Sequence, residues 1–363
     1  MICCENCFKD SEIKSIIKSY SKLGKCDLCG SDDVNIYDTE CDDYLIELFE
    51  GLFDIYVEED KFEDKSHQDK MKLLKDELKE NWDIFENSIT PYMIEVTISN
   101  ICKDYFESRS SLLKSRVGFL RLTDSEYLDN NSIVGRYDWD TFVKSIKNKY
   151  RFHTDIFVKK ILKEYCTHLV RVVKKDEMFY RARISGITGH ISNEMGAPPP
   201  EIASAGRVNP AGLSYLYLAD SQDTTVYETR ASLHDYVCIG KFRAVQDMRI
   251  IDLTRLDSIS VFSAGLDYAF HAINRGHLKR INDEVAKPIR SSDSQLEYLP
   301  TQYICDYIKS IQNEDNLTEQ AYQGIMYKST MINTSYNLAV FDPELFECIE
   351  TETKNITTVA YGY

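Results

Sequence analysis

The sequence predicts an α+β fold in three segments, because its pattern of apolar residues changes twice along the 363 residues. Residues 1–41 are rich in cysteine, residues 42–175 follow the three- and four-residue spacing of helices, and residues 176–363 alternate short strands, turns and helices. A chain of this length is also too long for one typical domain. We therefore expect a cysteine-rich segment, a helical domain and a C-terminal domain of mixed α/β structure.

The composition limits the partners of this chain. Its formal net charge of −16 argues against a broad nucleic-acid-binding surface, because such a surface needs clustered lysine and arginine. No apolar run approaches the roughly 20 residues that span a bilayer, and the N-terminus MICCENCFKD lacks the charged and apolar regions of a signal peptide. We expect a cytoplasmic protein with no membrane or nucleic-acid partner, whose eleven cysteines are mostly thiols or metal ligands.

The first segment carries two Cys-x2-Cys pairs. Cys4 pairs with Cys7 and Cys26 with Cys29, and 18 residues separate the two pairs. This spacing is typical of a four-thiolate zinc site, in which two tight turns each present two sulfurs to a tetrahedral ion. Cys3 is an alternative to Cys4, and scattered buried thiols are the alternative to a metal site. Because four sulfurs leave no coordination position for water, we expect a structural zinc without a catalytic role.

The second segment is expected to be helical. Its first helix places apolar residues on one face: Leu45, Leu48, Phe49, Leu52 and Tyr56. Further helices are expected over residues 71–85, 93–113, 138–147 and 154–170, with the charged stretch 58–70 as a solvated connection. Arg151 and His153 are too close for the Arg-x4–6-His motif of HEPN ribonucleases, so we expect a scaffold or sensor without nuclease activity.

The third segment is expected to begin with the alternating strand MFYRARI and to continue with a strand over residues 215–219. A helix then opens near residues 221–223. The rest of the pattern predicts strands at 236–244, 248–256, 324–330 and 337–342, helices at 263–272 and 298–309, and a loop over 281–295. The last twenty residues are expected at a peripheral edge.

The densest chemistry lies between residues 178 and 230. Arg181 lies on the first strand, Arg207 on a loop stiffened by proline and glycine, Tyr217 on the second strand, and Glu228 on the helix that follows. Two arginines, a tyrosine and a carboxylate at strand ends and loops are typical of a site for a phosphate-bearing ligand.

These residues resemble a RES domain, the toxin domain named for its arginine, glutamate and serine, over residues 178–342. The residues that carry the resemblance follow the order of the family's motifs: Tyr180, Arg181, Gly206, Arg207, Asn209, Pro210, Tyr217, Leu218, Ala219, Glu228, Gly324, Tyr327, Ser329, Asn337 and Phe341. Val208 departs from the family's frequent tryptophan, a change that affects packing more than chemistry. The N-terminal half resembles a zinc-ribbon-like and HEPN-like helical extension found fused to some RES domains.

The resemblance implies an ADP-ribosyltransferase-like fold and an NAD-consuming toxin or defence effector. The nicotinamide–ribose bond of NAD, the substrate, would be cleaved by phosphorolysis or hydrolysis. Glu228, Arg181 and Ser329 would be catalytic, with Ser335 as the alternative serine. The NAD-binding residues would be Arg181, Arg207, Tyr217, Asn209 and Ser329. Transfer of ADP-ribose to a protein target and a non-catalytic partner-binding module are the alternatives. An antitoxin or regulatory protein and a second copy of the chain are the expected macromolecular partners.

Overall fold

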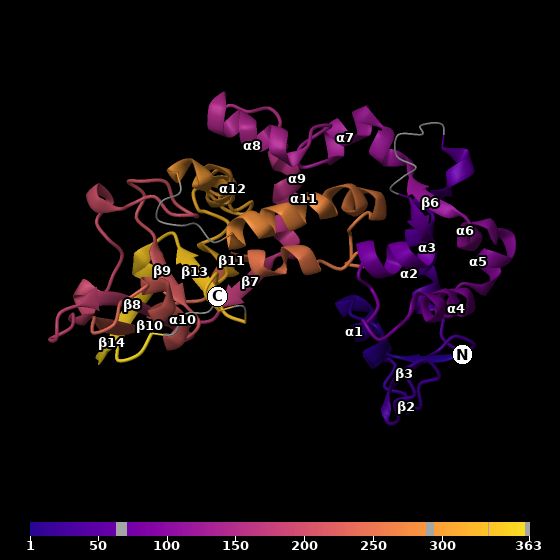
Figure 1. Cartoon of the computed structure of the whole chain (residues 1–363), viewed down its shortest axis with the longest axis horizontal. Helices are drawn as coiled ribbons and strands as arrows, with labels where there is room; N and C mark the ends of the chain where they lie inside the picture. Colours follow the sequence, from indigo (N-terminus) through magenta and orange to yellow (C-terminus); the bar gives the residue numbers. More distant parts are fainter. Residues whose placement is uncertain (63–70, 288–293, 333, 360–363) are drawn as a thin grey trace. The chain divides into compact units, whose positions relative to one another are not determined.

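The computed structural model describes residues 1–62, 71–287, 294–332 and 334–359. The chain forms two compact units, one of Met1–Ser132 with Ser258–Arg275 and the other of Ile133–Asp257 with Gly276–Tyr363 (Figure 1). Helices and strands occur in both units, which confirms the predicted α+β class. None of the helices in the described residues is long and apolar enough to span a membrane.

The first unit begins with a small cysteine-bearing sheet. Its strands β1 (Ile2–Cys4), β3 (Val34–Asp38) and β2 (Leu23–Gly24) pair antiparallel in that order. Helix α1 (Ser11–Ser19) starts at Asp10, whose carboxylate accepts from the backbone N–H groups of Glu12 and Ile13. This small sheet brings the two Cys-x2-Cys pairs together.

The rest of the first unit is only partly helical. Its helices are α2 (Tyr44–Phe53), α4 (Pro91–Ile101), α5 (Lys103–Ser108), α6 (Ser111–Lys114) and α7 (Ser125–Asn131). The same unit holds a second sheet of β4 (Tyr56–Glu58), β6 (Arg116–Phe119) and β5 (Lys72–Leu73). No strand was expected in this helical segment, although β6 lies outside the helices predicted there. The predicted helix over 71–85 is instead β5, a short α3 (Leu74–Asp76) and a π-helical turn, Glu77–Asn81.

Two further helix predictions need correction. The predicted helix over 93–113 is three helices, because the backbone at Cys102 (φ −110°, ψ 51°) and Arg109 (φ −128°, ψ 40°) is not helical. The predicted loop over 281–295 begins inside helix α11 (Tyr268–Ala286), in which Leu278, Ile281 and Val285 continue the buried helical spacing. Residues 63–70 and 288–293, parts of the predicted connection and loop, lie outside the described residues.

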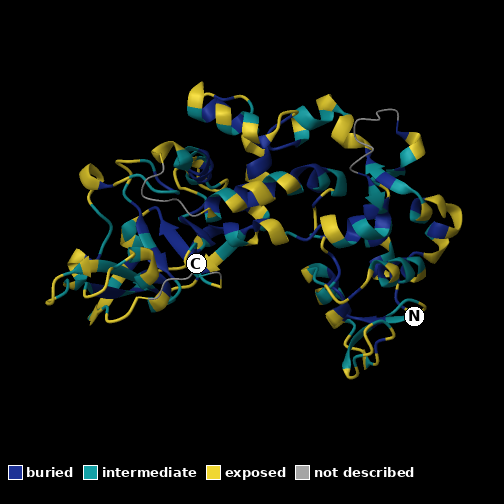
Figure 2. Cartoon of the chain, in the orientation of Figure 1, coloured by how far each residue is buried: buried dark blue, intermediate teal, exposed yellow. Residues whose placement is uncertain are grey.

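The second unit is built on one eight-stranded sheet in the order β14-β10-β8-β9-β13-β12-β11-β7. Its strands are β7 (Val170–Val173), β8 (Met178–Ser185), β9 (Leu216–Ala219), β10 (Tyr236–Ala244), β11 (Met248–Asp252), β12 (Gly324–Lys328), β13 (Tyr336–Val340) and β14 (Phe346–Asn355). Among the described strands of this sheet, β11 and β12 alone pair in parallel. The last strand, β14, is an edge strand, as expected for the end of the chain. The central strands are deeply buried (Figure 2).

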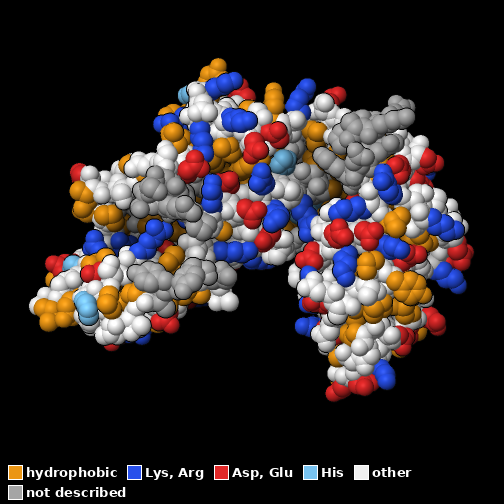
Figure 3. All heavy atoms as spheres, in the orientation of Figure 1, with side chains coloured by type: hydrophobic (Ala, Val, Ile, Leu, Met, Phe, Trp, Pro, Cys, Tyr) orange, Lys and Arg blue, Asp and Glu red, His pale blue; other side chains and the backbone are white. Residues whose placement is uncertain are grey.

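The described residues that lie wholly in the second unit form the α-helices α8 (Trp139–Asn148), α9 (Lys159–His168), α10 (Gln222–Thr229) and α12 (Leu299–Ser310). The helix predicted over 154–170 begins only at Lys159. One face of the sheet carries a continuous core that includes Phe179, Leu218, Phe242 and Leu338. On the surface view, Lys and Arg side chains are interspersed with Asp and Glu over both units (Figure 3).

Candidate active site

Glu228 lies near the end of helix α10, directly after strand β9. The helix starts at Ser221, whose hydroxyl accepts from the backbone N–H of Thr224, and ends at Arg230 in a left-handed conformation (φ 52°). The Glu228 side chain is exposed, yet its Oε1 accepts two hydrogen bonds, from the Ser329 hydroxyl at 2.8 Å and the Asn337 amide at 2.9 Å. A carboxylate on a helix is thus tied to the sheet.

The sheet fixes both donors. Ser329 directly follows β12, and Asn337 lies in β13 opposite Tyr327 on one side and Ala219 on the other. Both donors are buried, with exposed fractions of 5% for Ser329 and 7% for Asn337. The structure therefore brings Ser329, the predicted family serine, to Glu228, whereas the alternative Ser335 contributes its backbone oxygen to the Ser329 N–H at 2.9 Å.

Arg207 lies on a loop held by helix α12. Gln302 donates to the backbone oxygens of Gly206 at 2.7 Å and Asn209 at 3.0 Å, and Thr301 donates to that of Arg207 at 2.8 Å. The guanidinium of Arg207 donates to the backbone oxygen of Val285 at 2.5 Å. Helix α12 thus supports the backbone on both sides of this arginine.

Arg207 interacts electrostatically with the carboxylate of Glu228. Burial lowers the pKa of Arg207, while the nearby phenols of Tyr327 and Tyr298 and the charge of Glu228 act in the opposite direction. Burial has the opposite effect on Tyr327, whose charged form is the anion, and raises its pKa. The negative charge of Glu228 raises that pKa further. Arg207, Tyr327 and Glu228 therefore interact electrostatically, and the phenol of Tyr327 stays protonated beside the carboxylate.

Tyr217 and Asn209 lock the same loop. The Tyr217 hydroxyl donates to Asn209 Oδ1, and the Asn209 amide donates to the backbone oxygens of Ser204 (3.0 Å), Pro210 (3.1 Å) and Leu213 (2.9 Å). Burial raises the pKa of Tyr217. Both side chains, expected to bind ligand, are thus engaged in holding the loop.

Arg181 takes a different position from the other predicted residues. Tyr180 pairs with Ala219, so alternation along β8 places Arg181 on the opposite face of the sheet, with Phe179. Its guanidinium donates to the backbone oxygen of Tyr217 at 3.2 Å, and within the described parts of the chain its buried Nε has no hydrogen-bond partner. Burial lowers its pKa to about 10.

Sequence reasoning gave no role to Thr301 and Gln302 and did not place Asn337 in the site. Thr301 and Gln302 follow Pro300 at the start of α12, and both are buried. Two buried polar side chains in one helical turn are the signal for such a role, because buried polar groups need partners. That signal appears only once burial is known.

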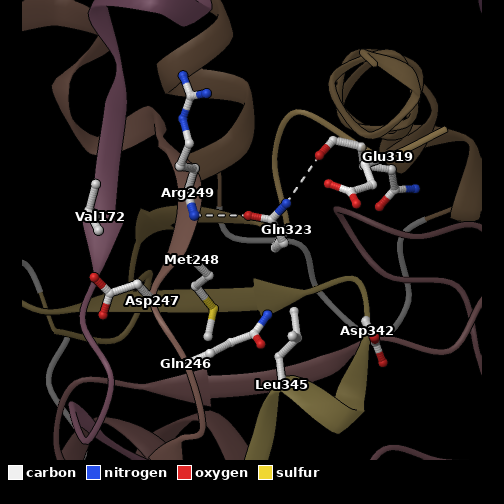
Figure 4. Close-up of a pocket in the computed structure, with 10 residues that line it drawn as sticks. Val172, Gln246, Asp247, Met248, Arg249, Glu319, Gln323, Asp342 and Leu345 are labelled. Carbon is white, nitrogen blue, oxygen red and sulfur yellow. Dashed lines mark hydrogen bonds between the residues drawn. The ribbon is translucent and has the colours of Figure 1, made fainter. Parts of the chain in front are cut away.

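A surface pocket of about 460 Å³ lies elsewhere in the second unit (Figure 4). It is lined by residues from β7, β11 and nearby connecting segments: Val172, Gln246, Asp247, Met248, Arg249, Glu319, Gln320, Gln323, Asp342 and Leu345. Gln323 accepts from the Arg249 N–H at 2.9 Å, as the close-up shows. None of the predicted site residues lines this pocket.

The four predicted metal ligands come together in the first unit. The sulfurs of Cys4, Cys7, Cys26 and Cys29 all lie within 4.8 Å of one another, with Sγ–Sγ distances of 3.7 Å (Cys4–Cys7), 3.5 Å (Cys4–Cys29) and 3.6 Å (Cys7–Cys26). A tetrahedral ion with bonds of about 2.3 Å to sulfur needs separations of about 3.8 Å. The Cys29 N–H also donates to Cys26 Sγ at 3.5 Å. The cluster therefore fits a metal ion.

Comparison with known proteins gives one positive result. The family model described as RES domain matches residues 178–359, which is half of the chain. No curated protein and no solved structure matches. The matched range contains Arg207, Glu228, Ser329 and Asn337.

Proposed function

Because the chain belongs to the RES domain family, we propose that its C-terminal domain is an NAD-consuming toxin or defence effector. The proposed reaction breaks the bond between nicotinamide and ribose by phosphorolysis or hydrolysis. The observation that carries this proposal is the carboxylate of Glu228, which is held by Ser329 and Asn337 and interacts electrostatically with Arg207.

The chemistry of this bond matches the side chains present. As nicotinamide leaves, positive charge develops on the ribose, and a carboxylate that is already oriented stabilises that charge without reorganising. The pyrophosphate of NAD needs cationic hydrogen-bond donors, which arginine supplies well. Glu228 would serve the ribose and Arg207 the phosphates.

Arg181 is the second proposed phosphate ligand. Its buried Nε is without a partner among the described residues, and an unsatisfied buried donor costs about 1–3 kcal/mol. Because alternation along β8 places Arg181 on the face opposite Tyr180 and Ala219, it would need a phosphate position of its own, separate from that of Arg207. Tyr217 would then contribute mainly by holding the loop of Arg207, through its bond to Asn209.

The experiment that tests this function is incubation of the purified chain with NAD, with and without inorganic phosphate. Nicotinamide release in either condition supports the proposal. Free ADP-ribose identifies hydrolysis, phosphorylated ADP-ribose identifies phosphorolysis, and ADP-ribose attached to a protein identifies transfer. If no nicotinamide is released and no protein is labelled, the enzymatic proposal is refuted and a partner-binding role takes its place.

We also propose that Cys4, Cys7, Cys26 and Cys29 bind a structural zinc ion. Three of these cysteines are buried and Cys29 is exposed, so the site lies just below the surface. Four thiolates would complete the coordination of the ion and leave no position for a substrate. The metal would then stabilise the small sheet β1-β3-β2 and take no part in NAD cleavage.

A further inference from the structure

We infer that Ser329 and Asn337 are positioning residues that hold Oε1 of Glu228, so that Oε2 is the oxygen that faces the reacting ribose. This inference rests on the proposed function, and it assigns Ser329 a role other than direct contact with NAD. It also adds Asn337 to the machinery of the site.

The hydrogen-bonding capacity of Ser329 supports this role. A hydroxyl group has one hydrogen to donate and two lone pairs to accept with. The hydrogen goes to Glu228 Oε1 at 2.8 Å, and the oxygen accepts from the backbone N–H groups of Met331 at 3.1 Å and Ile332 at 3.4 Å. Its capacity is therefore used within the protein, and none remains for a ribose hydroxyl or a phosphate.

Asn337 is held by its strand rather than by a flexible loop. Its backbone lies between β12 and β9, in register with Tyr327 and Ala219. The side-chain amide therefore meets Glu228 Oε1 from a fixed point, at 2.9 Å. Because one donor directly follows β12, the other lies in β13, and both converge on one oxygen, they fix the rotation of the carboxylate as well as its position.

The other oxygen of Glu228 has a different environment. In the described parts of the chain, Oε2 accepts no hydrogen bond, and the residue as a whole is exposed. An oxygen that is open to ligand, on a carboxylate oriented by two hydrogen bonds, is the arrangement that stabilises a developing positive charge. Oε2 is therefore the oxygen available for the ribose.

Kinetics of Ser329→Ala and Asn337→Leu separate positioning from binding. Losing one hydrogen bond to a charged group should lower kcat roughly 10- to 100-fold, with KM for NAD nearly unchanged, because the lost contact is with Glu228. A raised KM with an unchanged kcat would show direct substrate contact and overturn the inference. Asn355→Asp on the edge strand β14 serves as the control.

Asn337→Asp provides a pH-dependent readout. Two carboxylates that meet at hydrogen-bond distance hold one shared proton, and each repels the other once that proton is lost. Turnover by Asn337→Asp should therefore recover as the pH falls, whereas Asn337→Leu should stay impaired at every pH. Identical pH profiles for the two variants would contradict the proposed contact.

Thermal unfolding tests the contact without relying on activity. The unfolding temperature of Asn337→Asp should be lower at pH 8 than at pH 5. This drop should be larger than the drop that Asn355→Asp shows between the same two pH values. Adding Glu228→Gln to the same chain should restore the lost stability, because a glutamine amide can donate to the new carboxylate. Absence of both effects overturns the inference. A wild-type chain that releases no nicotinamide refutes the proposed function instead, and with it the catalytic role of this contact.

Discussion

Gln302 donates its side-chain amide to the backbone oxygen of Gly206 at 2.7 Å, which ties helix α12 to the loop of Arg207. The same amide reaches the oxygen of Asn209 at 3.0 Å, so one buried side chain spans the turn. The position of a guanidinium proposed to bind phosphate thus depends on a residue almost one hundred positions away in the sequence.

Gln302→Leu should weaken NAD binding more than it slows bond cleavage. The substitution removes both bonds to the loop. The Asn209 oxygen keeps the Gly206 N–H as a donor at 2.9 Å, but the Gly206 oxygen loses its bond to Gln302, and an unpaired buried acceptor costs about 1–3 kcal/mol. We expect a higher KM for NAD and a lower unfolding temperature. Gln320→Leu, at an exposed position, is the control, and equal behaviour of the two variants would refute the role of Gln302.

Gly206→Ala should disturb the same loop by steric conflict. A Cβ atom at this position would lie 2.8 Å from Asn209 Oδ1 and 3.1 Å from the Tyr217 hydroxyl, two atoms already bonded to each other. We expect a loss of about 1–3 kcal/mol in the free energy of unfolding, together with reduced turnover. Gly196→Ala is the matched control, since its Cβ would meet no atom within 4 Å. Equal stability of both variants would contradict this packing.

Cys7→Ser should reduce the zinc content of the purified protein, which we expect to be about one ion per chain. Loss of one of four ligands should also lower the unfolding temperature of the first unit. Metal analysis and calorimetry measure both effects. Cys41→Ser, at an exposed cysteine outside the cluster, should retain the metal. A wild-type protein without bound metal after purification in zinc-containing medium would argue against the site.

His277 should make the second unit sensitive to mild acid. Burial lowers its pKa from 6.5 to about 4, although the negative charge of Asp138 opposes the change. Below pH 6.5 His277 binds a proton in the unfolded chain but stays neutral in the folded chain until the pH approaches 4. The stability of the folded chain is therefore highest above pH 6.5 and falls as the pH is lowered toward 4.

The test is urea unfolding of His277→Leu between pH 4 and 7. The substitution should reduce the change in the free energy of unfolding between pH 7 and pH 4 by at most about 3 kcal/mol. His153→Leu, at an exposed position, should leave the slope unchanged. An unaltered slope in His277→Leu would show that this histidine does not contribute.

The C-terminal fold was the most predictable part of the chain. Alternating or continuous apolar runs mark strands of the large sheet, and the predicted strand over 236–244 coincides with β10. The spacing of the four cysteines also predicted their cluster, because Cys-x2-Cys pairs are a local pattern. The match to the RES domain confirms the family that the motifs around Arg207, Glu228 and Ser329 indicated.

The features that the sequence did not predict depend on tertiary structure or are too short to leave a pattern. The strands β4, β5 and β6 are only two to four residues long, too short for a periodic signal. The support given by Gln302 and the opposite-face position of Arg181 depend on long-range pairing, which single-sequence patterns do not contain. The HEPN-like character of the helices stays a prediction.

The most direct test of the central claim is nicotinamide release from NAD by the wild-type chain and by Glu228→Gln, measured side by side. Glutamine keeps the oxygen that accepts from Ser329 and Asn337 but removes the charge, so the fold should persist. We predict turnover by the wild type and a loss of at least about 100-fold in the variant. Full turnover by a folded Glu228→Gln protein would contradict the account.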